Sequence, residues 1–104
     1  MIKVSVLYPA GEGKTFDFDY YRTTHRPLVQ KILGDVLQGM EIERGLSGPF
    51  PGSEPPFLAC GHLLFESVET LMPALMASAG KIMEDMPNFT NSSPTIQISE
   101  IAPG

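Results

Sequence analysis

The stretch that decides the fold is Phe57-Leu58-Ala59-Cys60-Gly61-His62-Leu63-Leu64-Phe65. It is typical of a β-strand, and successive side chains of a strand point to opposite faces of the sheet. Both alternating faces are apolar, with Phe57, Ala59, Leu63 and Phe65 on one and Leu58, Cys60 and Leu64 on the other. His62 is the single polar interruption. A strand with this pattern must be covered on both faces.

Two amphipathic helices are predicted, one before this strand and one after it. Apolar residues recur at three- and four-residue steps between Asp17, a suitable N-cap, and Gly34, a suitable C-terminal residue. A second apolar stripe follows Ser67, its N-cap, and ends at Pro87. Hydrophobic alternation predicts three further strands at residues 2–7, 36–46 and 96–101.

The order strand, helix, strand, strand, helix, strand predicts an α+β fold. Right-handed crossovers place both helices on one face of a four-stranded antiparallel sheet, which is the ferredoxin-like βαββαβ arrangement. The other face of the sheet is then bare in a single chain. Because the strand at residues 57–65 is apolar there too, we expect a second copy of the sheet to cover it in a twofold homodimer, through Cys60, His62 and Leu64.

Length and charge limit the classes of function. The chain has 104 residues, so we treat residues 1–104 as a single domain. Seven Lys and Arg against twelve Asp and Glu give a formal net charge of −5. Because the basic residues are scattered, we expect no nucleic-acid partner, which would need clustered positive charge. The apolar runs are too short to span a bilayer and no signal-like segment is recognised, so we expect a cytoplasmic protein without a membrane partner.

His25 is the main candidate for chemistry. It lies on the inward stripe of the first predicted helix, one turn after Tyr21. Pro27 follows two residues later, and its ring leaves the carbonyl group of Thr23 without a helical donor. An imidazole with a pKa of about 6.5 beside irregular backbone and a phenol is a candidate general acid or base. The alternative is a buried structural histidine bonded to a carbonyl or hydroxyl group, and the sequence leaves both open.

The second histidine points to packing rather than to a metal site. Cys60 and His62 project from the same face of one strand, so a twofold dimer can bring two of each near its axis. Four ligands at bonding distance would need a close crossing of the two sheets. Interface packing is favoured, with His62 hydrogen-bonded to a residue such as Gln97 or Ser99. We therefore expect no metal and no cofactor.

Four segments of the chain together form a pattern known from one family. They are Asp17–Tyr21, His25–Leu28, Gly61–Glu69 and Ile96–Glu100, and they extend over nearly the whole chain. In this order they resemble the EthD family, named for a protein of bacterial ethyl tert-butyl ether degradation. The resemblance implies a dimeric α/β barrel, in agreement with the covered sheet face inferred above. It also implies a bacterial cytoplasmic protein that accompanies catabolic oxidoreductases.

The resemblance further implies a pocket between the helices and the sheet, where relatives in the wider superfamily bind their substrates. Polyketide cyclases of that superfamily carry further polar residues at pocket positions that are apolar or glycine here. Only His25 with Tyr20 or Tyr21 then remains polar. The residues expected in the pocket are Tyr20, Tyr21, His25, Phe57, Ala59, Leu63, Leu75 and Met76.

Two functions follow from this pocket. The first is a binding or accessory protein that holds a small apolar metabolite and supports an oxidative degradation pathway, with a pathway oxygenase as a candidate partner. The alternative is a cofactor-independent isomerase, lyase or monooxygenase. In that case His25 is the general acid or base and Tyr21 orients or polarises the substrate.

Overall fold

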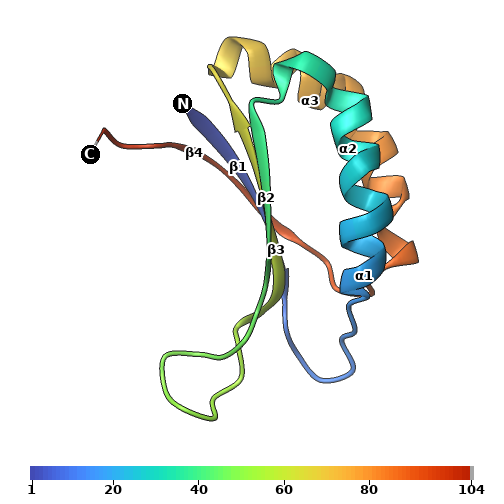
Figure 1. Cartoon of the computed structure of the whole chain (residues 1–104), viewed down its shortest axis with the longest axis vertical. Coiled ribbons are helices and arrows are strands. Elements are labelled where there is room, and N and C mark those ends of the chain that lie inside the picture. Colours follow the sequence, from blue (N-terminus) through green and yellow to red (C-terminus); the bar gives the residue numbers. More distant parts are fainter. Residues whose placement is uncertain (104) are drawn as a thin grey trace.

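The structure, a computed structural model, describes residues 1–103 and shows one sheet with helices packed on one of its faces (Figure 1). The order of strands and helices is the one that the sequence predicts. The elements are β1 (Ile2–Pro9), α1 (Phe18–Tyr20), the π-helical turn η1 (Tyr21–His25), α2 (Arg26–Leu33), the 3₁₀ turn η2 (Gly34–Val36), β2 (Gly39–Arg44), β3 (Phe57–Phe65), α3 (Val68–Glu84), the 3₁₀ turn η3 (Met86–Asn88) and β4 (Thr95–Glu100).

The sheet is antiparallel throughout, with the strand order β2-β3-β1-β4. This is the predicted ferredoxin-like α+β fold. The two most apolar strands, β1 and β3, lie at the centre, where Val4 is opposite Leu63 and Ser5 is opposite His62. Strand β2 is shorter than expected, because residues 34–36 form a 3₁₀ turn and pairing with β3 begins only at Gly39.

The first helical region contains the irregular backbone that Pro27 predicts. It begins where the Asp17 carboxylate accepts the Tyr20 backbone N–H at 3.1 Å, and it ends at Gly34, whose φ of 62° suits only glycine. Between these ends, η1 widens into a π-helical turn in which the Arg26 N–H reaches the carbonyl group of Tyr21. Proline has no N–H to give, and a π-turn accommodates the missing donor.

Helix α3 is held at its start by a reciprocal cap. The Ser67 side chain accepts the backbone N–H of Thr70, and the Thr70 side chain bonds back to the Ser67 N–H. The helix then places its apolar stripe over the sheet, with Leu71 fully buried and Leu75 half-buried. The helical faces that cover β1 and β3 therefore come from both halves of the chain.

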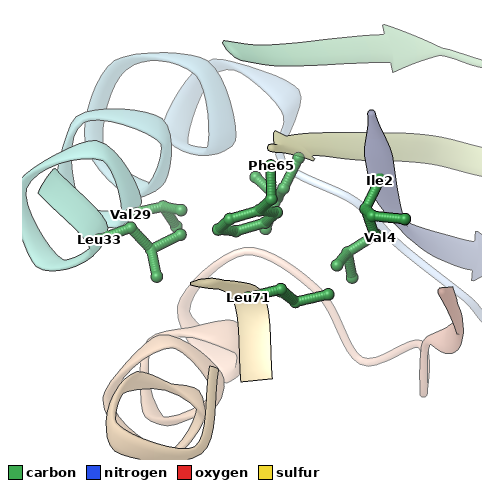
Figure 2. Close-up of a cluster of buried hydrophobic side chains, with 7 residues drawn as sticks. Ile2, Val4, Val29, Leu33, Phe65 and Leu71 are labelled. Atoms are coloured by element: carbon green, nitrogen blue, oxygen red, sulfur yellow. The ribbon is translucent and has the colours of Figure 1, made fainter. Parts of the chain in front are cut away.

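The core divides into an aliphatic cluster and an aromatic one. The aliphatic cluster joins α2, α3, β1 and β3, and Figure 2 shows Phe65 between Val29 and Leu33 on one side and Ile2 and Val4 on the other. The aromatic cluster lies at the α1 end of the helical layer. Its buried members are Tyr8, Tyr21, Ala59 and Phe89, with Phe16, Phe18 and Tyr20 packed against them.

The second face of the sheet carries no helix in the described residues (Figure 1). Cys60, His62 and Leu64 lie on this open face and are half-buried in the single chain. The expected hydrogen-bond partners of His62 are wrong. Both residues lie on β4, which is separated from His62 on β3 by the strand β1. The Gln97 side-chain amide donates instead to the Ser99 hydroxyl, at 3.0 Å.

The ring of His62 is bonded within the sheet to its two neighbouring strands. Its Nδ1 atom lies 3.0 Å from the Ser5 hydroxyl, and its Nε2 atom lies 3.0 Å from a Glu43 carboxylate oxygen. The Ser5 side chain of β1 and the Glu43 side chain of β2 make this face of the sheet more polar than the residues of β3 alone indicate. Its cover by a second copy stays a prediction.

Candidate ligand-binding site

A cavity of about 140 Å³ lies between the sheet and the helices α2 and α3. The sheet contributes apolar side chains such as Val4, Val6 and Leu63 to its wall. Helix α3 contributes Leu75, Ala79 and Ile82, which are the middle of its inward stripe. The wall is apolar except at one imidazole and two phenols, from His25, Tyr8 and Tyr21.

The cavity reaches solvent between α3 and the edge strand β4. Met83 and Ile96 both line it, and they are 50% and 49% exposed, whereas the lining residues of β1 are buried or half-buried. Strand β4 is an edge strand, and its Ile96 and Ile98 side chains are exposed, so this edge is less covered than the centre of the sheet. A flexible methionine side chain at this mouth can adapt to ligands of different shape.

His25 is the polar group at the other end of the cavity. It is 2% exposed, and its Nδ1 atom lies 2.9 Å from the Oδ2 atom of Asp85. The imidazole ring stacks on the Tyr21 ring, with centroids 5.5 Å apart, and its centroid lies 4.6 Å from that of the Phe89 ring. Two rings and one hydrogen bond therefore hold the imidazole in one orientation.

Asp85 is the functional residue that the sequence analysis missed. It follows the last residue of α3, and its other oxygen, Oδ1, accepts the Tyr20 hydroxyl at 2.7 Å and the Asn88 amide at 2.9 Å. A signal for it exists in the sequence, because Asp85 comes three residues after Ile82 and continues the inward stripe of α3. A carboxylate that continues an apolar stripe is expected to be partly buried, and a buried carboxylate must be hydrogen-bonded to nearby donor groups.

The pKa values describe a neutral imidazole beside a charged carboxylate. Burial lowers the pKa of His25 below 6.5 and outweighs Asp85, which raises it. Burial raises the pKa of Asp85, but the hydrogen bonds from Asn88, Tyr20 and His25 outweigh it, so the pKa falls below 3.8. At neutral pH the ring therefore carries no charge while Asp85 carries one.

The two phenols of the cavity stay neutral as well. Burial raises the pKa of Tyr8 to about 12, against the opposing effect of the Tyr21 hydroxyl, and burial also raises the pKa of Tyr21. The Tyr21 hydroxyl lies directly over Gly61, where any Cβ atom would collide with it. Glycine at this position of β3 is thus what lets the Tyr21 ring reach the sheet.

A comparison with protein-family models gives one match, the EthD domain, over residues 10–93. The chain belongs to the EthD family. No curated protein matches the chain. The matched region begins after β1 and includes His25, Asp85 and most of the EthD cavity wall.

Solved structures of EthD proteins share this fold. An EthD-like protein of Ralstonia eutropha JMP134 is 37% identical, with a TM-score of 0.89, covering 95% of this chain and 89% of the other. An EthD family protein of Bacillus halodurans C-125 is 30% identical, with a TM-score of 0.74 over 98% and 99% of the two chains. HapK from Hahella chejuensis, 6% identical with a TM-score of 0.63 over 100% and 95%, shares the fold alone.

Of the residues that the sequence places in the EthD pocket, four line the cavity: Tyr21, His25, Leu63 and Leu75. Tyr20 is not part of the wall and touches the site only through its bond to Asp85. The position expected for Met76 is wrong, since Met76 is 80% exposed. It follows Leu75 directly, and one residue turns a helix by about 100°, which carries the side chain out of the inward stripe.

The other two β3 residues of that set, Ala59 and Phe57, lie beside the cavity rather than in its wall. Ala59 is fully buried in the aromatic cluster with Tyr8 and Tyr21. Phe57 is half-buried at the end of β3, where the register with β1 shifts between Tyr8 and Pro9. At this end of the sheet the cavity wall is formed by the phenol rings of Tyr8 and Tyr21 and not by the side chains of Phe57 and Ala59.

Two findings bear on other classes of site in the EthD chain. No helix formed by residues 1–103 has the length and apolar character needed to cross a membrane. In the same part of the chain, no three His, Cys, Asp or Glu side chains gather closely enough to hold a metal ion.

Proposed function

We propose that this EthD protein binds a small, mostly apolar metabolite in the cavity between its sheet and helices. The observation that carries the proposal is a cavity of about 140 Å³ whose apolar wall is interrupted only by one oriented imidazole and two phenols. A cavity of about this volume holds one benzene-sized molecule. The apolar body of the metabolite would contact α3 and β1, and its polar atom would meet His25.

The proposed role is that of an accessory protein in a bacterial pathway of oxidative breakdown. Membership of the EthD family supports it, together with the bacterial sources of two EthD relatives of known structure. In this role Leu75 contacts the ligand directly, while Tyr20 and Ala59 support the residues that do. A pathway oxygenase is the proposed recipient of the ligand.

Binding is tested with toluene as the probe and the methionine methyl groups as reporters. Met83 of α3 and Met86 of η3 line the cavity, whereas Met76 of α3 is 80% exposed. In NMR spectra of methyl-labelled protein, saturable shifts of the Met83 and Met86 signals are expected, with the Met76 signal unmoved. Equal shifts at all three methyl groups would mean non-specific contact and would reject the cavity as the site.

A matched pair of variants on α3 separates the cavity from the rest of the surface. Ala79 lines the cavity, while Ala77 is exposed two residues earlier. Ala79→Leu fills part of the cavity and is expected to weaken toluene binding at least tenfold. Ala77→Leu adds the same side chain outside the cavity and is expected to leave binding unchanged. Unchanged binding in Ala79→Leu contradicts the proposal.

A second candidate function is supported by the His25–Asp85 pair. A neutral imidazole whose Nδ1 atom is held by a carboxylate at 2.9 Å is the arrangement of a general base. The candidate reaction is proton abstraction from an activated carbon acid, as in a cofactor-independent isomerase, lyase or monooxygenase. Tyr21, which stacks on His25 and lines the cavity, would orient the substrate.

This enzyme function is tested by hydrogen exchange in D₂O. A ketone with an acidic C–H bond is incubated with the protein, and the incorporation of deuterium is followed by NMR. A positioned base typically contributes about 10²–10⁴-fold, so His25→Asn is expected to reduce exchange by at least a hundredfold. If the protein accelerates no exchange while toluene still binds, the accessory function stands alone.

We also propose that the open face of the sheet is covered by a second copy of the chain. The half-buried Cys60, His62 and Leu64 are the central residues of that face on β3. The face mixes apolar side chains with the bonded polar group of Ser5, His62 and Glu43, a composition seen in protein–protein interfaces. This cover is tested by the mass in solution of the unmodified protein and of the Leu64→Glu variant.

A further inference from the structure

The hydrogen in the bond between His25 and Asp85 belongs to His25. An ionised carboxylate has no hydrogen to give, and the pKa of Asp85 lies below 3.8. The hydrogen of the 2.9 Å bond is therefore carried by Nδ1. Because the pKa of His25 is lowered, the ring is neutral and holds a single hydrogen, which leaves Nε2 with a free lone pair.

Asp85 is itself held in one orientation by two donors on the same oxygen. The Tyr20 hydroxyl and the Asn88 amide both donate to Oδ1, at 2.7 and 2.9 Å. Oδ2 is left for His25 alone. Tyr20 and Asn88, which are outside the cavity wall, thus orient Asp85, and Asp85 in turn fixes the ring hydrogen of His25 on Nδ1.

The Nε2 atom of His25 opens onto the cavity. Among residues 1–103 it has no hydrogen-bond partner, although His25 is 2% exposed and lines the cavity. No side-chain nitrogen or oxygen of these residues is sealed away from solvent without a partner. The Nε2 atom therefore keeps some contact with solvent, and because His25 lines the cavity, we take the cavity to be where a ligand's donor reaches it.

On the basis of the proposed binding function, we infer that the cavity selects a small apolar molecule bearing one neutral hydroxyl group, an alcohol or a phenol, and rejects the matching carboxylate. A hydroxyl donates to the lone pair of Nε2. A carboxylate would present its negative charge to that lone pair, with Asp85 just behind the ring. The cavity wall contains no Lys or Arg to offset the charge.

Four probes of similar size test this selectivity by calorimetry or NMR titration. Toluene has no polar atom, phenol donates, benzaldehyde only accepts, and benzoate is an anion. Phenol is expected to bind about tenfold more tightly than toluene or benzaldehyde, as one added hydrogen bond implies. Benzoate is expected to bind at least tenfold more weakly than toluene.

Asp85→Asn provides a sharper test, because it is expected to invert the preference. The Tyr20 and Asn88 donors keep an oxygen at the Oδ1 position, so the new amide nitrogen takes the place of Oδ2. That nitrogen donates to Nδ1 of His25, which moves the ring hydrogen to Nε2. The variant is then expected to bind benzaldehyde more tightly than phenol, because Nε2–H donates to the carbonyl oxygen while the phenol hydroxyl loses its acceptor.

Glu43→Gln is the matched control. It makes the same change, carboxylate to amide, in the His62 pair on the open face, which is outside the cavity wall. The order of the four probes is expected to remain that of the unmodified protein. A change of order in this variant would mean that the preference does not arise at His25, and would overturn the inference.

The outcomes separate the inference from the proposed function. If toluene and phenol both fail to bind, the binding function and the inference fall together. If toluene binds but phenol binds no better, or benzoate binds as tightly, the inference is overturned and apolar binding survives.

Nitrogen-15 NMR of His25 without any ligand shows independently which ring nitrogen carries the hydrogen. The inference requires the hydrogen on Nδ1 in the unmodified protein and on Nε2 in Asp85→Asn.

Discussion

The two sides of the sheet each hold one histidine bonded to one carboxylate. His25 and Asp85 lie on the helical side, with Nδ1 and Oδ2 2.9 Å apart, and their side chains are 3% and 12% exposed. His62 and Glu43 lie on the open face, with Nε2 and Oε1 3.0 Å apart, and their side chains are 15% and 58% exposed. The bond lengths are nearly equal, while the surroundings differ.

This difference shows that burial, more than bond length, decides what such a pair can do. Water competes for the Glu43 carboxylate, so the pair on the open face adds little stability, as exposed ion pairs generally do. The His25 pair is shielded by aromatic rings, where electrostatic interactions are stronger. Its free nitrogen faces a cavity, whereas both ring nitrogens of His62 already have partners.

The largest effect is expected from a charge placed on the open face. We expect the unmodified protein to be a dimer and Leu64→Glu to dissociate it, because removing a new carboxylate from water in an interface can cost more than pairing with a cation such as Lys3 returns. Light scattering should show the mass falling from twice the chain mass to 11.3 kDa. Lys3 lies opposite Leu64 in the sheet and is expected to let the single chain tolerate the new carboxylate.

Leu64→Met is the control for this change, since it alters shape without adding charge and is expected to leave the mass unchanged. A Leu64→Glu protein with unaltered circular dichroism confirms that the fold persists. If the unmodified protein has the mass of one chain at micromolar concentration, the proposed cover of the open face is wrong.

The second prediction concerns Gly61, whose neighbour in sequence, His62, lies on the opposite face. In Gly61→Ala the new Cβ collides with the buried Tyr21 hydroxyl on the helical side. We expect a loss of about 1 to 3 kcal/mol in unfolding free energy, measured by urea denaturation. Gly80→Ala in the exposed part of α3 meets no atom within 4 Å and is expected to be neutral or stabilising by up to about 1 kcal/mol.

The third prediction compares the two carboxylates directly. Asp85→Ala removes the acceptor of three donors, from Tyr20, Asn88 and His25, and is expected to cost about 1 to 2 kcal/mol of unfolding free energy. Glu43→Ala removes one exposed partner and is expected to change it by less than about 0.5 kcal/mol. Equal losses in thermal or urea denaturation would contradict the distinction between the two pairs.

Much of the fold can be predicted from the sequence because its signals are local. Asp17 and Gly34 bound the first helical region, Ser67 caps α3, and Pro27 marks irregular backbone; each acts within a few residues of itself. The strand order follows from the handedness of the crossovers once the elements are known. The strand predicted at residues 36–46 is longer than β2, because Val36 suits a strand but ends the 3₁₀ turn in the structure.

The site is less predictable because it depends on contacts between distant segments. His25 and Tyr21 are recognisable from one helical stripe, but Asp85 lies 60 positions further along the chain and needs the packing of α3 to reach His25. The sequence predicts Met76 in the wall because it is apolar and adjacent to Leu75, but its side chain is 80% exposed, whereas Met83 on the same helix does line the cavity. Apolarity alone does not tell the inner face of a helix from the outer one.

The smallest effect is expected from acid, and its pH range identifies the buried pair. The folded pKa of His25 lies below the 6.5 of the unfolded chain, so between these values the unfolded state binds more protons. Stability is therefore full above pH 6.5 and declines as the pH falls, by up to about 1.4 kcal/mol per unit within that interval. Asp85 has a lowered pKa, so its contribution persists until the pH falls below 3.8.

Urea denaturation at pH 7.5, 6 and 5 measures this decline. His25→Asn carries no group that titrates at that position and is expected to lose less stability across the three pH values than the unmodified protein. His62→Asn removes the imidazole of the open face instead and is expected to keep the decline. If the two variants exchange these behaviours, the histidine that couples folding to acid is on the open face, and the contrast between the two pairs must be reversed.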